Sequence, residues 1–374
     1  MDRVLVTGGA GFIGSHTVDL LVEKGYSVLI LDNLEDQVHR GRTPKYLNRE
    51  AVFIKGDVRD RELLKGLIRE VDAIIHLAAA VGVGQSMYQV EKYIDYNTKG
   101  TATLLDVIVN VENRVRKVVV ASSMSIYGEG RYYCERCNEY FNPGLRKDDQ
   151  LKRRVWEHLC PNCGSALQPK PTSEDKPPMP TSIYAQSKKH QEEMCLLIGR
   201  TYGIPTVALR YFNVYGPRQS LSNPYTGACA IFASRLLNNK QPYIFEDGGQ
   251  LRDFVHVKDV ARANLLALER SSADYEAVNI GTGRPTPIRE VAKLLAEALN
   301  LNIEPYISNR YRKGDVRHCY ADISKARRLL GYEPRIPLNE GLKELAQWAI
   351  EERWGAKDRF EESLKELEER GLVG

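Results

Sequence analysis

The sequence lacks any hydrophobic run long enough to cross a membrane. No window of its 374 residues approaches the roughly 18 uninterrupted apolar residues that a membrane-spanning helix needs. An export signal is missing as well, because Met1 is followed almost at once by the short apolar run Val4-Leu5-Val6, with no basic segment before it. We therefore expect a cytoplasmic protein without a membrane partner.

A strong excess of one charge is also missing. The chain has 53 lysine and arginine residues against 49 aspartate and glutamate residues, which gives a formal net charge of +4. A protein that binds nucleic acid through bulk charge concentrates basic residues on one face. The near balance of the two signs predicts no nucleic-acid partner, so the function has to be argued from particular sites.

The first part of the chain has the pattern of a dinucleotide-binding unit. An apolar strand leads into a glycine-rich turn, and a helix and a second strand that ends at Asp32 follow. Gly8 allows the tight turn, Gly11 lets a pyrophosphate approach the backbone, and Gly14 allows close helix-strand packing. The Asp32 carboxylate suits two ribose hydroxyls and repels a 2′-phosphate, which favours NAD. Two arginines shortly after it keep NADP as the alternative.

Strands and helices continue to alternate after this unit. Apolar strands are expected near residues 51–54, 73–77 and 118–121, with helices near 61–69 and 90–110. Continuous apolar strands separated by helices predict a parallel sheet that is covered on both faces. The fold class is therefore a Rossmann-type, doubly wound α/β fold, in which ligands bind at the carboxyl ends of the strands.

The pattern predicts three parts of the chain. An NAD-binding Rossmann domain is expected over residues 1–130 and 181–215, and a smaller C-terminal α/β domain, mainly substrate-binding, over 216–374. Residues 131–180 break the alternation and are expected to form an insertion and a linker. The C-terminal tail, from about residue 358, is a mixed acidic and basic helix in which no chemistry is expected.

The insertion contains two CxxC pairs, Cys134 with Cys137 and Cys160 with Cys163. Each pair can hold two thiolates for tetrahedral Zn²⁺, and two pairs make a Cys₄ site without an open coordination position. Such a site is structural, and it would fold a zinc-ribbon-like insertion that has little core of its own. Disulfides or free thiols are the alternative, because the spacer is slightly longer than the usual template.

A tyrosine and a lysine four residues apart, Tyr184 and Lys188, follow the insertion. On a helix these side chains lie one turn apart on the same face, so the ammonium can act on the phenol. An unperturbed phenol has a pKa near 10, and a nearby cation and an oxidised nicotinamide both favour the phenolate. Tyr184 can then act as a base. Because this spacing also arises by chance, the interpretation depends on Ser122, Ser123 and the glycine turn.

These motifs together resemble one family. TGGAGFIG at the N-terminus, the Ser122-Ser123 pair, YxxxK, RYFNVYGPR and RDFVHVKD are similar to the extended short-chain dehydrogenase/reductases, specifically their nucleotide-sugar epimerases and dehydratases. The resemblance covers nearly the whole chain outside the cysteine insertion. In the family, an Asp-Glu pair after the active-site serine or threonine marks the 4,6-dehydratases, and Met124 and Ser125 stand at those positions here. An epimerase is therefore favoured.

Within the epimerases, four stretches resemble the dTDP-L-rhamnose 4-epimerases, some of which also carry the paired CxxC insertion. They lie at residues 32–39, 80–88, 122–128 and 222–227. The expected reaction is the conversion of dTDP-L-rhamnose to dTDP-6-deoxy-L-talose. UDP-glucose/UDP-galactose 4-epimerase is the alternative, with the same chemistry at the same carbon.

The resemblance implies a mechanism without net redox change. Tyr184, ionised through Lys188 and NAD⁺, removes the proton of the C4 hydroxyl while a hydride passes from C4 to the nicotinamide. Ser123 hydrogen-bonds the same oxygen, and Lys188 also holds the nicotinamide ribose. The 4-keto sugar turns in the pocket and takes the hydride back on its other face.

The resemblance also implies the binding residues and a homodimer, formed through a bundle of Rossmann helices that includes the Tyr184 helix. The cofactor would be lined by Gly8, Gly11, Phe12, Ile13, Gly14, Asp32, Asn33, Asp57, Val58, Leu77, Ala78, Ala79, Asn97, Ser122, Tyr184, Lys188 and Phe212. The nucleotide-sugar substrate would be held by Ser123, Asn213, Arg252, Arg312 and Asp315.

A function from another class is a binding protein that senses NAD and docks a macromolecule on the insertion. The basic spacer residues Arg146, Lys147 and Lys152 motivate it. Interleaved acidic residues favour a solvated face instead. The complete Ser/Tyr/Lys set favours the enzyme, because a sensor does not need it.

Overall fold

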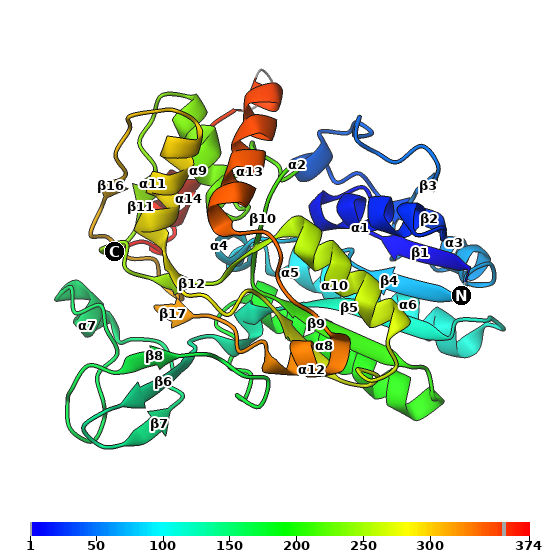
Figure 1. The fold of residues 1–374 in the computed structure, drawn as a ribbon, viewed down its shortest axis with the longest axis horizontal. Coiled ribbons are helices and arrows are strands. Elements are labelled where there is room, and N and C mark those ends of the chain that lie inside the picture. Colours follow the sequence, from blue (N-terminus) through cyan, green and yellow to red (C-terminus); the bar gives the residue numbers. More distant parts are fainter. Residues whose placement is uncertain (1, 354–356) are drawn as a thin grey trace.

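The chain forms one large parallel sheet, seen here in a computed structural model that describes residues 2–353 and 357–374 (Figure 1). Its strands are β1 (Arg3–Thr7), β2 (Ser27–Asp32), β3 (Val52–Lys55), β4 (Ala73–His76), β5 (Lys117–Ser123), β9 (Thr206–Tyr211) and β14 (Ala277–Ile280). They lie in the order β14-β9-β5-β4-β1-β2-β3, and each neighbouring pair is parallel. The predicted Rossmann-type sheet is confirmed, with its crevice where the strand order reverses, between β1 and β4.

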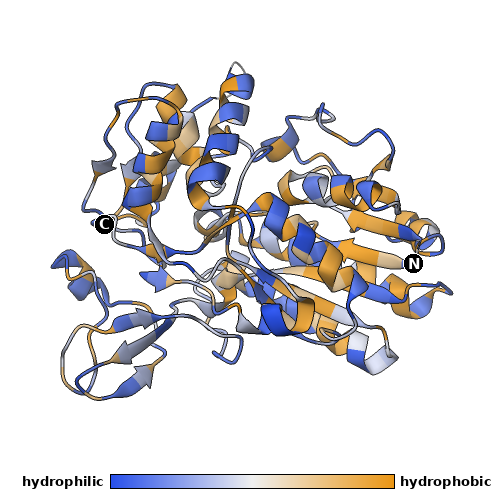
Figure 2. Cartoon of the chain, in the orientation of Figure 1, coloured by the Kyte–Doolittle hydropathy of each residue, from blue (hydrophilic) through white to orange (hydrophobic). Residues whose placement is uncertain are grey.

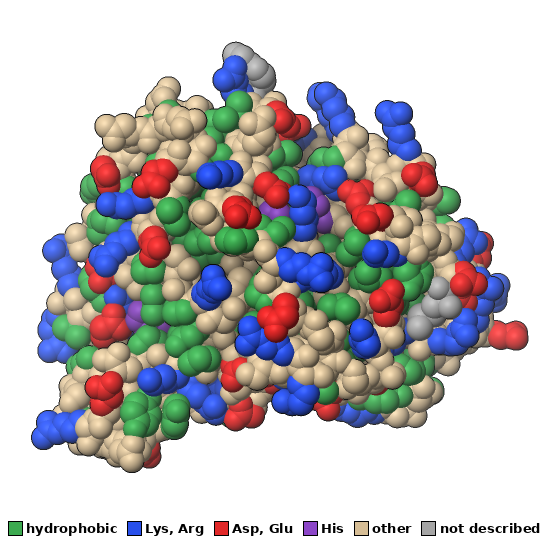
Figure 3. All heavy atoms as spheres, in the orientation of Figure 1, with side chains coloured by type: hydrophobic (Ala, Val, Ile, Leu, Met, Phe, Trp, Pro, Cys, Tyr) green, Lys and Arg blue, Asp and Glu red, His purple; other side chains and the backbone are tan. Residues whose placement is uncertain are grey.

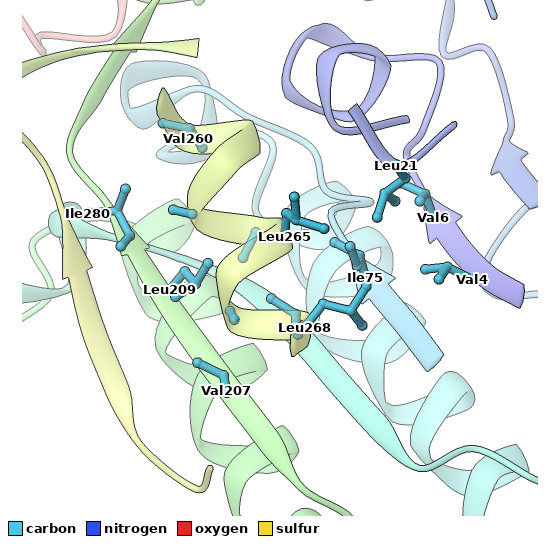
Figure 4. Close-up of a cluster of buried hydrophobic side chains, with 14 of the residues drawn as sticks. Val4, Val6, Leu21, Ile75, Val207, Leu209, Val260, Leu265, Leu268 and Ile280 are labelled. Carbon is cyan, nitrogen blue, oxygen red and sulfur yellow. The ribbon is translucent and has the colours of Figure 1, made fainter. Parts of the chain in front are cut away.

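Helices cover both faces of this sheet. They are α1 (Phe12–Glu23) and α10 (Val257–Glu269) on one face, and α3 (Arg61–Ile68), α6 (Gly100–Asn110) and α8 (Ile183–Tyr202) on the other. Successive strand residues point to opposite faces. Val4 and Val6 therefore pack in the cluster of Figure 4, while Leu5 packs under α3 and α6. The strands consequently form a largely hydrophobic layer in Figure 2.

The helix expected over residues 90–110 contains a π-helical turn. α5 (Val90–Tyr93) continues through the π segment Ile94–Lys99 into α6. Widened turns of this kind are frequent at functional sites. This one carries Asn97, which is fully buried.

A second, smaller part of the molecule has its own hydrophobic core. α9 (Ala228–Leu237), α11 (Ile288–Ala298) and α13 (Leu338–Glu352) pack around it. Three small sheets lie outside the large one: β10 (Asn213–Tyr215) with β13 (Phe254–His256), β11 (Tyr243–Ile244) with β16 (Tyr306–Ile307), and β12 (Leu251–Arg252) with β15 (Thr286–Pro287) and β17 (His318–Cys319). The remaining helices are α2 (Asp36–His39), α4 (Val83–Ser86), α12 (Ser324–Leu330), α14 (Phe360–Glu369) and the 3₁₀ turn Met124–Tyr127.

Residues after 216 do not all belong to this second part. β14 is the edge strand of the large sheet, where Val278 and Ile280 join the same core cluster as α10. The segment predicted as mainly substrate-binding therefore also completes the Rossmann sheet. The sequence interpretation did not assign β14 or α10 to the Rossmann domain, because nothing local indicates which core a short apolar strand joins.

The cysteine insertion forms a small antiparallel sheet at the lower left of Figure 1. It consists of β6 (Arg131–Cys134), β7 (Glu139–Phe141) and β8 (Gln168–Lys170), with α7 (Asp148–Lys152) beside it. Its core is Tyr132, Leu167 and the four thiols. So small a core leaves the insertion dependent on other contacts.

Buried ion pairs attach the insertion to the second part of the molecule. Arg146 donates to both oxygens of Glu246, at 2.7 and 2.9 Å, and Arg317 donates to the same carboxylate at 3.0 Å. Arg317 also donates to Glu157 of the insertion at 2.6 Å. Each guanidinium group is nearly fully buried, so its charge has to be balanced by these carboxylates.

Charge and apolarity elsewhere agree with the composition. On the face drawn in Figure 3, basic and acidic side chains are interspersed rather than gathered by sign. In the part of the chain that the structure describes, no helix is both long enough and apolar enough to span a membrane.

Replacing Glu246 by glutamine should destabilise the protein by about 3 kcal/mol, because two buried guanidinium groups lose their shared carboxylate. Urea unfolding of the full chain measures this. The matched control is Glu276→Gln, which removes an exposed pair with Lys325 and should change the free energy of unfolding by less than about 0.5 kcal/mol. Equal effects of the two variants would contradict the assignment.

Candidate active site

A cavity of about 620 Å³ opens at the carboxyl ends of the large sheet. Its walls come from the glycine turn, the ends of β2, β4 and β5, the start of α8 and the second part of the molecule. Every residue predicted to be catalytic, to bind the cofactor or to bind the substrate lines this cavity, with the exception of Asn97.

The glycine turn brings the N-terminus of α1 to the cavity. Gly8 has φ +71°, and a Cβ there would lie 2.8 Å from the backbone nitrogen of Ala78. A Cβ on Gly14 would lie 2.1 Å from the carbonyl oxygen of Gly8. A side chain on Gly8 would push the turn away from the segment after β4, and one on Gly14 would push α1 away from the turn. The first turn of α1 has no side-chain cap, so its N–H groups remain available to an anion.

Two carboxylates close the far end of the glycine turn. Asp32 is almost fully buried and accepts hydrogen bonds from the backbone N–H groups of Ala10, at 3.1 Å, and Leu34, at 2.9 Å. Asp57 accepts from Asn33 at 2.9 Å and pairs with Arg59. Burial works to raise the pKa of Asp57, but the hydrogen bonds from Arg59 and Asn33 prevail and lower it to about 2. Asp57 is therefore ionised at neutral pH.

The candidate reaction centre lies where β5 meets the start of α8. Ser123 ends β5, and its hydroxyl oxygen accepts hydrogen bonds from the backbone N–H of Ser125 at 3.1 Å and from its hydroxyl at 2.9 Å. Ser182 caps α8, which fixes Tyr184 in the first turn. Burial raises the pKa of Tyr184, and a hydrogen bond with Ser123 works in the opposite direction. The net effect is a rise, so the phenol is protonated unless a bound cation lowers its pKa.

Lys188 is buried one turn further along α8. Its ammonium donates to the carbonyl oxygen of Ala121 at 2.8 Å and to Oε1 of Gln191 at 2.9 Å, and Gln191 donates to Thr101 at 2.7 Å. Burial lowers the pKa of Lys188 to about 7. These two acceptors, rather than the phenol of Tyr184, receive its hydrogen bonds among the described residues.

The opposite wall carries the predicted substrate residues. Arg252 donates to the carbonyl oxygens of Val316 and Arg317, at 2.6 and 2.9 Å, which fixes its direction. Arg312 pairs with Asp315 at 2.8 Å. Oδ1 of Asn213 is buried and has no hydrogen-bond partner among the described residues. An unpaired buried acceptor in a cavity wall is costly unless a ligand donates to it.

Asn97 does not reach the cavity. Its Oδ1 accepts from the backbone N–H of Ala80 at 2.7 Å, and its Nδ2 donates to the carbonyl oxygen of Ala80 at 3.0 Å and to Ser187 at 2.9 Å. The side chain therefore fixes the loop after β4 against α8. Asn97 therefore supports the cavity wall without lining the cavity, whereas the sequence predicted a direct contact with the cofactor.

The sequence interpretation missed two groups of lining residues. Gln219 and Gln250 line the cavity, and the Oε1 of each is buried without a hydrogen-bond partner among the described residues. The C-terminal helix α14 contributes Phe360, Leu364 and Leu367. Their apolar spacing was visible in the tail, but nothing in it indicated which surface they would cover.

Comparison with known proteins agrees with this geometry. Residues 5–143 match the family model described as GDP-mannose 4,6 dehydratase, and residues 160–281 match that of the NAD dependent epimerase/dehydratase family. A dTDP-L-rhamnose 4-epimerase of Burkholderia thailandensis is 34% identical over 353 residues, which cover 94% of this chain and 95% of the relative. The chain belongs to the NAD-dependent epimerase/dehydratase family. The predicted extended short-chain dehydrogenase/reductase of the nucleotide-sugar epimerase type is thereby confirmed.

Solved members of this epimerase family superpose on nearly the whole chain. The structure of a UDP-glucose 4-epimerase from Thermotoga maritima with UDP-glucose has a TM-score of 0.77 and 35% identity, over 93% of this chain and 99% of that one. A UDP-glucuronic acid 4-epimerase from Bacillus cereus, in complex with UDP-glucuronic acid and NAD, has a TM-score of 0.76 and 28% identity over the same shares. These relatives agree on the class of reaction and differ in the sugar.

The buried ammonium leads to a prediction about pH. The pKa of Lys188 in the folded protein, about 7, is below its unfolded value near 10.4, so between pH 7 and 10 the unfolded chain binds more protons. The contribution of Lys188 to the free energy of unfolding therefore rises with pH between pH 7 and 10. Between pH 7 and 9, the free energy of unfolding of the cofactor-free wild type should rise by about 2 kcal/mol more than that of Lys188→Met, as measured by urea unfolding. Parallel curves for the two proteins would contradict the lowered pKa.

Proposed function

We propose that the chain is a nucleotide-sugar 4-epimerase that inverts C4 through a transient 4-keto sugar, with Ser123, Tyr184 and Lys188 as its catalytic residues. The observation that carries this proposal is the meeting of Ser123 and Tyr184 in one cavity with a glycine turn at one end and Arg252 and Arg312 at the other. That arrangement suits a dinucleotide at the glycine turn and a nucleotide-diphosphate sugar at the arginines, with their reacting ends meeting at Ser123 and Tyr184.

The residues present fit NAD. The uncapped N-terminus of α1 suits the pyrophosphate, and the Asp32 carboxylate suits the adenosine ribose. When bound, NAD would supply a temporary acceptor for the C4 hydride. Tyr184 would take the proton of the C4 hydroxyl, Ser123 would hold that oxygen, and the Lys188 ammonium would favour the phenolate and hold the nicotinamide ribose.

For the sugar, we propose dTDP-L-rhamnose, which would be converted to dTDP-6-deoxy-L-talose. Support comes from the similarity to the Burkholderia thailandensis enzyme over nearly the full length of both chains. UDP-glucose is the second candidate, favoured by the structural similarity to the Thermotoga maritima enzyme. An NAD-sensing binding protein fits less well, because it has no use for a tyrosine base next to Ser123.

We also propose a structural zinc ion on Cys134, Cys137, Cys160 and Cys163. Their sulfur atoms all lie within 4.8 Å of one another. Between the two CxxC pairs, the sulfurs of Cys134 and Cys163 are 3.5 Å apart and those of Cys137 and Cys160 are 3.7 Å apart. A tetrahedral Zn²⁺ with bonds of about 2.3 Å places its sulfurs about 3.8 Å apart, so the four thiols fit the ion. The ion would hold the two CxxC turns of the insertion together.

A homodimer through the Rossmann helices is proposed as well. Two large side chains near the end of α8 are exposed: 64% of Leu197 and 56% of Tyr202 is accessible. A dimer interface over this part of α8 would cover them. The pairing would bury the helix whose first turn carries Tyr184.

A panel of nucleotide sugars tests the function directly. Purified protein incubated with dTDP-L-rhamnose, UDP-glucose and UDP-glucuronic acid should convert one of them to its C4 epimer, followed by NMR or chromatography. Tyr184→Phe should lower turnover by at least about a thousandfold and still contain NAD, because only the proton acceptor is lost. An inert wild type, or an active Tyr184→Phe variant, would overturn the proposal.

Metal analysis tests the insertion. Freshly purified protein should contain one zinc per chain, and Cys137→Ser combined with Cys163→Ser should lose it. Because Arg146 of the insertion also donates to the carbonyl oxygen of Asp315, at 3.3 Å, metal loss should raise the KM for the nucleotide sugar more than it lowers NAD content. Glu135→Ala, an exposed residue between two of the thiols, is the matched control. Wild-type protein without stoichiometric zinc would refute the site.

A further inference from the structure

The C-terminal segment after residue 357 lies across the substrate end of the cavity. Helix α14, drawn in red in Figure 1, is fixed at its start by Arg235, which donates to Glu361 at 2.8 Å, and by Lys240, which pairs with Asp358 at 3.1 Å. Arg310 pairs with Glu368 near its end. These contacts tie the helix to the second part of the molecule at both ends.

The last residues pair with the segment that carries Arg312. The backbone N–H of Tyr311 donates to the carbonyl oxygen of Gly374 at 3.0 Å, and Gly374 donates back at 2.9 Å. Lys313 donates in the same way to Leu372 at 2.9 Å. Arg312 lies between these two hydrogen-bonded positions, so the tail fixes the backbone of a residue proposed to hold the diphosphate.

The other side of α14 contacts α4, which lines the same cavity as the reaction centre. A Cβ on Gly84 would lie 3.4 Å from a methyl group of Leu367, so this leucine rests directly on α4. The neighbouring residue of α4, Gln85, accepts a hydrogen bond from Tyr93 at 3.0 Å, and the Tyr93 ring meets the Tyr184 ring edge to face at 6.3 Å. These contacts connect Leu367 to Tyr184 through α4 and Tyr93, and both residues line the same cavity.

The position of α14 corresponds to one part of the substrate. In a nucleotide sugar, the hexose joins the diphosphate at C1 and carries the reacting hydroxyl at C4. A hexose whose C4 meets Tyr184 and whose phosphate meets Arg312 occupies the cavity that α14 also lines. The helix presents Leu364 and Leu367 to that space.

The charges around this space disfavour an acidic sugar. Glu366, next to Leu367, accepts hydrogen bonds from Tyr88, at 2.6 Å, and from Tyr225, which lines the cavity. Of the lysine and arginine side chains that line the cavity, Lys92 pairs with Glu35 and Lys188 donates to Ala121, while Arg252 and Arg312 are the residues proposed to hold the diphosphate. A sugar carboxylate beside Leu367 would lose water without gaining a dedicated cation.

We propose that Leu364 and Leu367 form the apolar wall of the hexose subsite and that, with Glu366 at its rim, they select uncharged nucleotide sugars over uronic acid derivatives. This inference rests on the proposed epimerase function. An apolar wall packs well against the C–H face or a methyl substituent of a hexose, whereas burial of a carboxylate there is unfavourable.

Binding measurements isolate the sugar from the nucleotide. By titration calorimetry in the Tyr184→Phe background, Leu367→Ala should weaken binding of dTDP-L-rhamnose by about tenfold, because an apolar contact is lost, and leave binding of free dTDP unchanged. If UDP-glucose is the better ligand of the parent protein, it and UDP replace that pair. The control Lys365→Ala lies on the exposed side of α14 and should behave as the parent.

The charge selectivity is tested by a milder variant. Glu366→Gln keeps an acceptor for Tyr88 and Tyr225, so it should preserve the fold and strengthen binding of UDP-glucuronic acid several-fold, with the neutral sugar unchanged. Equal weakening of sugar-bearing and sugar-free nucleotides by Leu367→Ala, or no effect of either variant, would overturn this inference. Failure of the wild type to epimerise any sugar would instead contradict the proposed function.

Discussion

The buried ammonium of Lys188 is the contact on which the geometry of the candidate site depends. By donating to the carbonyl oxygen of Ala121, it ties α8 to the end of β5 and so sets Tyr184 opposite Ser123. Burial makes this ammonium unfavourable, as the lowered pKa indicates. A cost of this kind in the cofactor-free protein is typical of a functional group, because bound ligand rather than the fold repays it.

Features set by local sequence could be predicted, and features set by distant contacts could not. The glycine turn, Asp32 and the Tyr184-Lys188 spacing each follow from a single stretch of chain whose backbone geometry is dictated by its own residues. By contrast, Asn97 was expected to contact the cofactor, and nothing in its own stretch indicated the π turn or the hydrogen bond that its side chain accepts from Ala80. A short apolar strand such as β14 could have joined either core.

The wall formed by α14 illustrates the same limit. Its apolar residues have ordinary amphipathic spacing, which predicts a helix with one buried face and not the surface that it covers. The surface is decided by ion pairs with Arg235 and Arg310 and by the backbone pairing of Gly374 with Tyr311. The insertion acts on the same end of the cavity through Arg146, although none of the described residues 131–180 lines it. Both additions act on the end of the cavity proposed for the substrate rather than on the end proposed for the cofactor.

The most direct test of the account follows the hydrogen at C4. The protein is incubated in ordinary water with dTDP-L-rhamnose, or with UDP-glucose if that is the substrate, carrying deuterium at C4, and the inverted product is examined by NMR. Because the proposed mechanism returns the same hydride to the carbon that gave it, the account predicts that the product keeps its deuterium at C4. A product that carries solvent hydrogen there would contradict it.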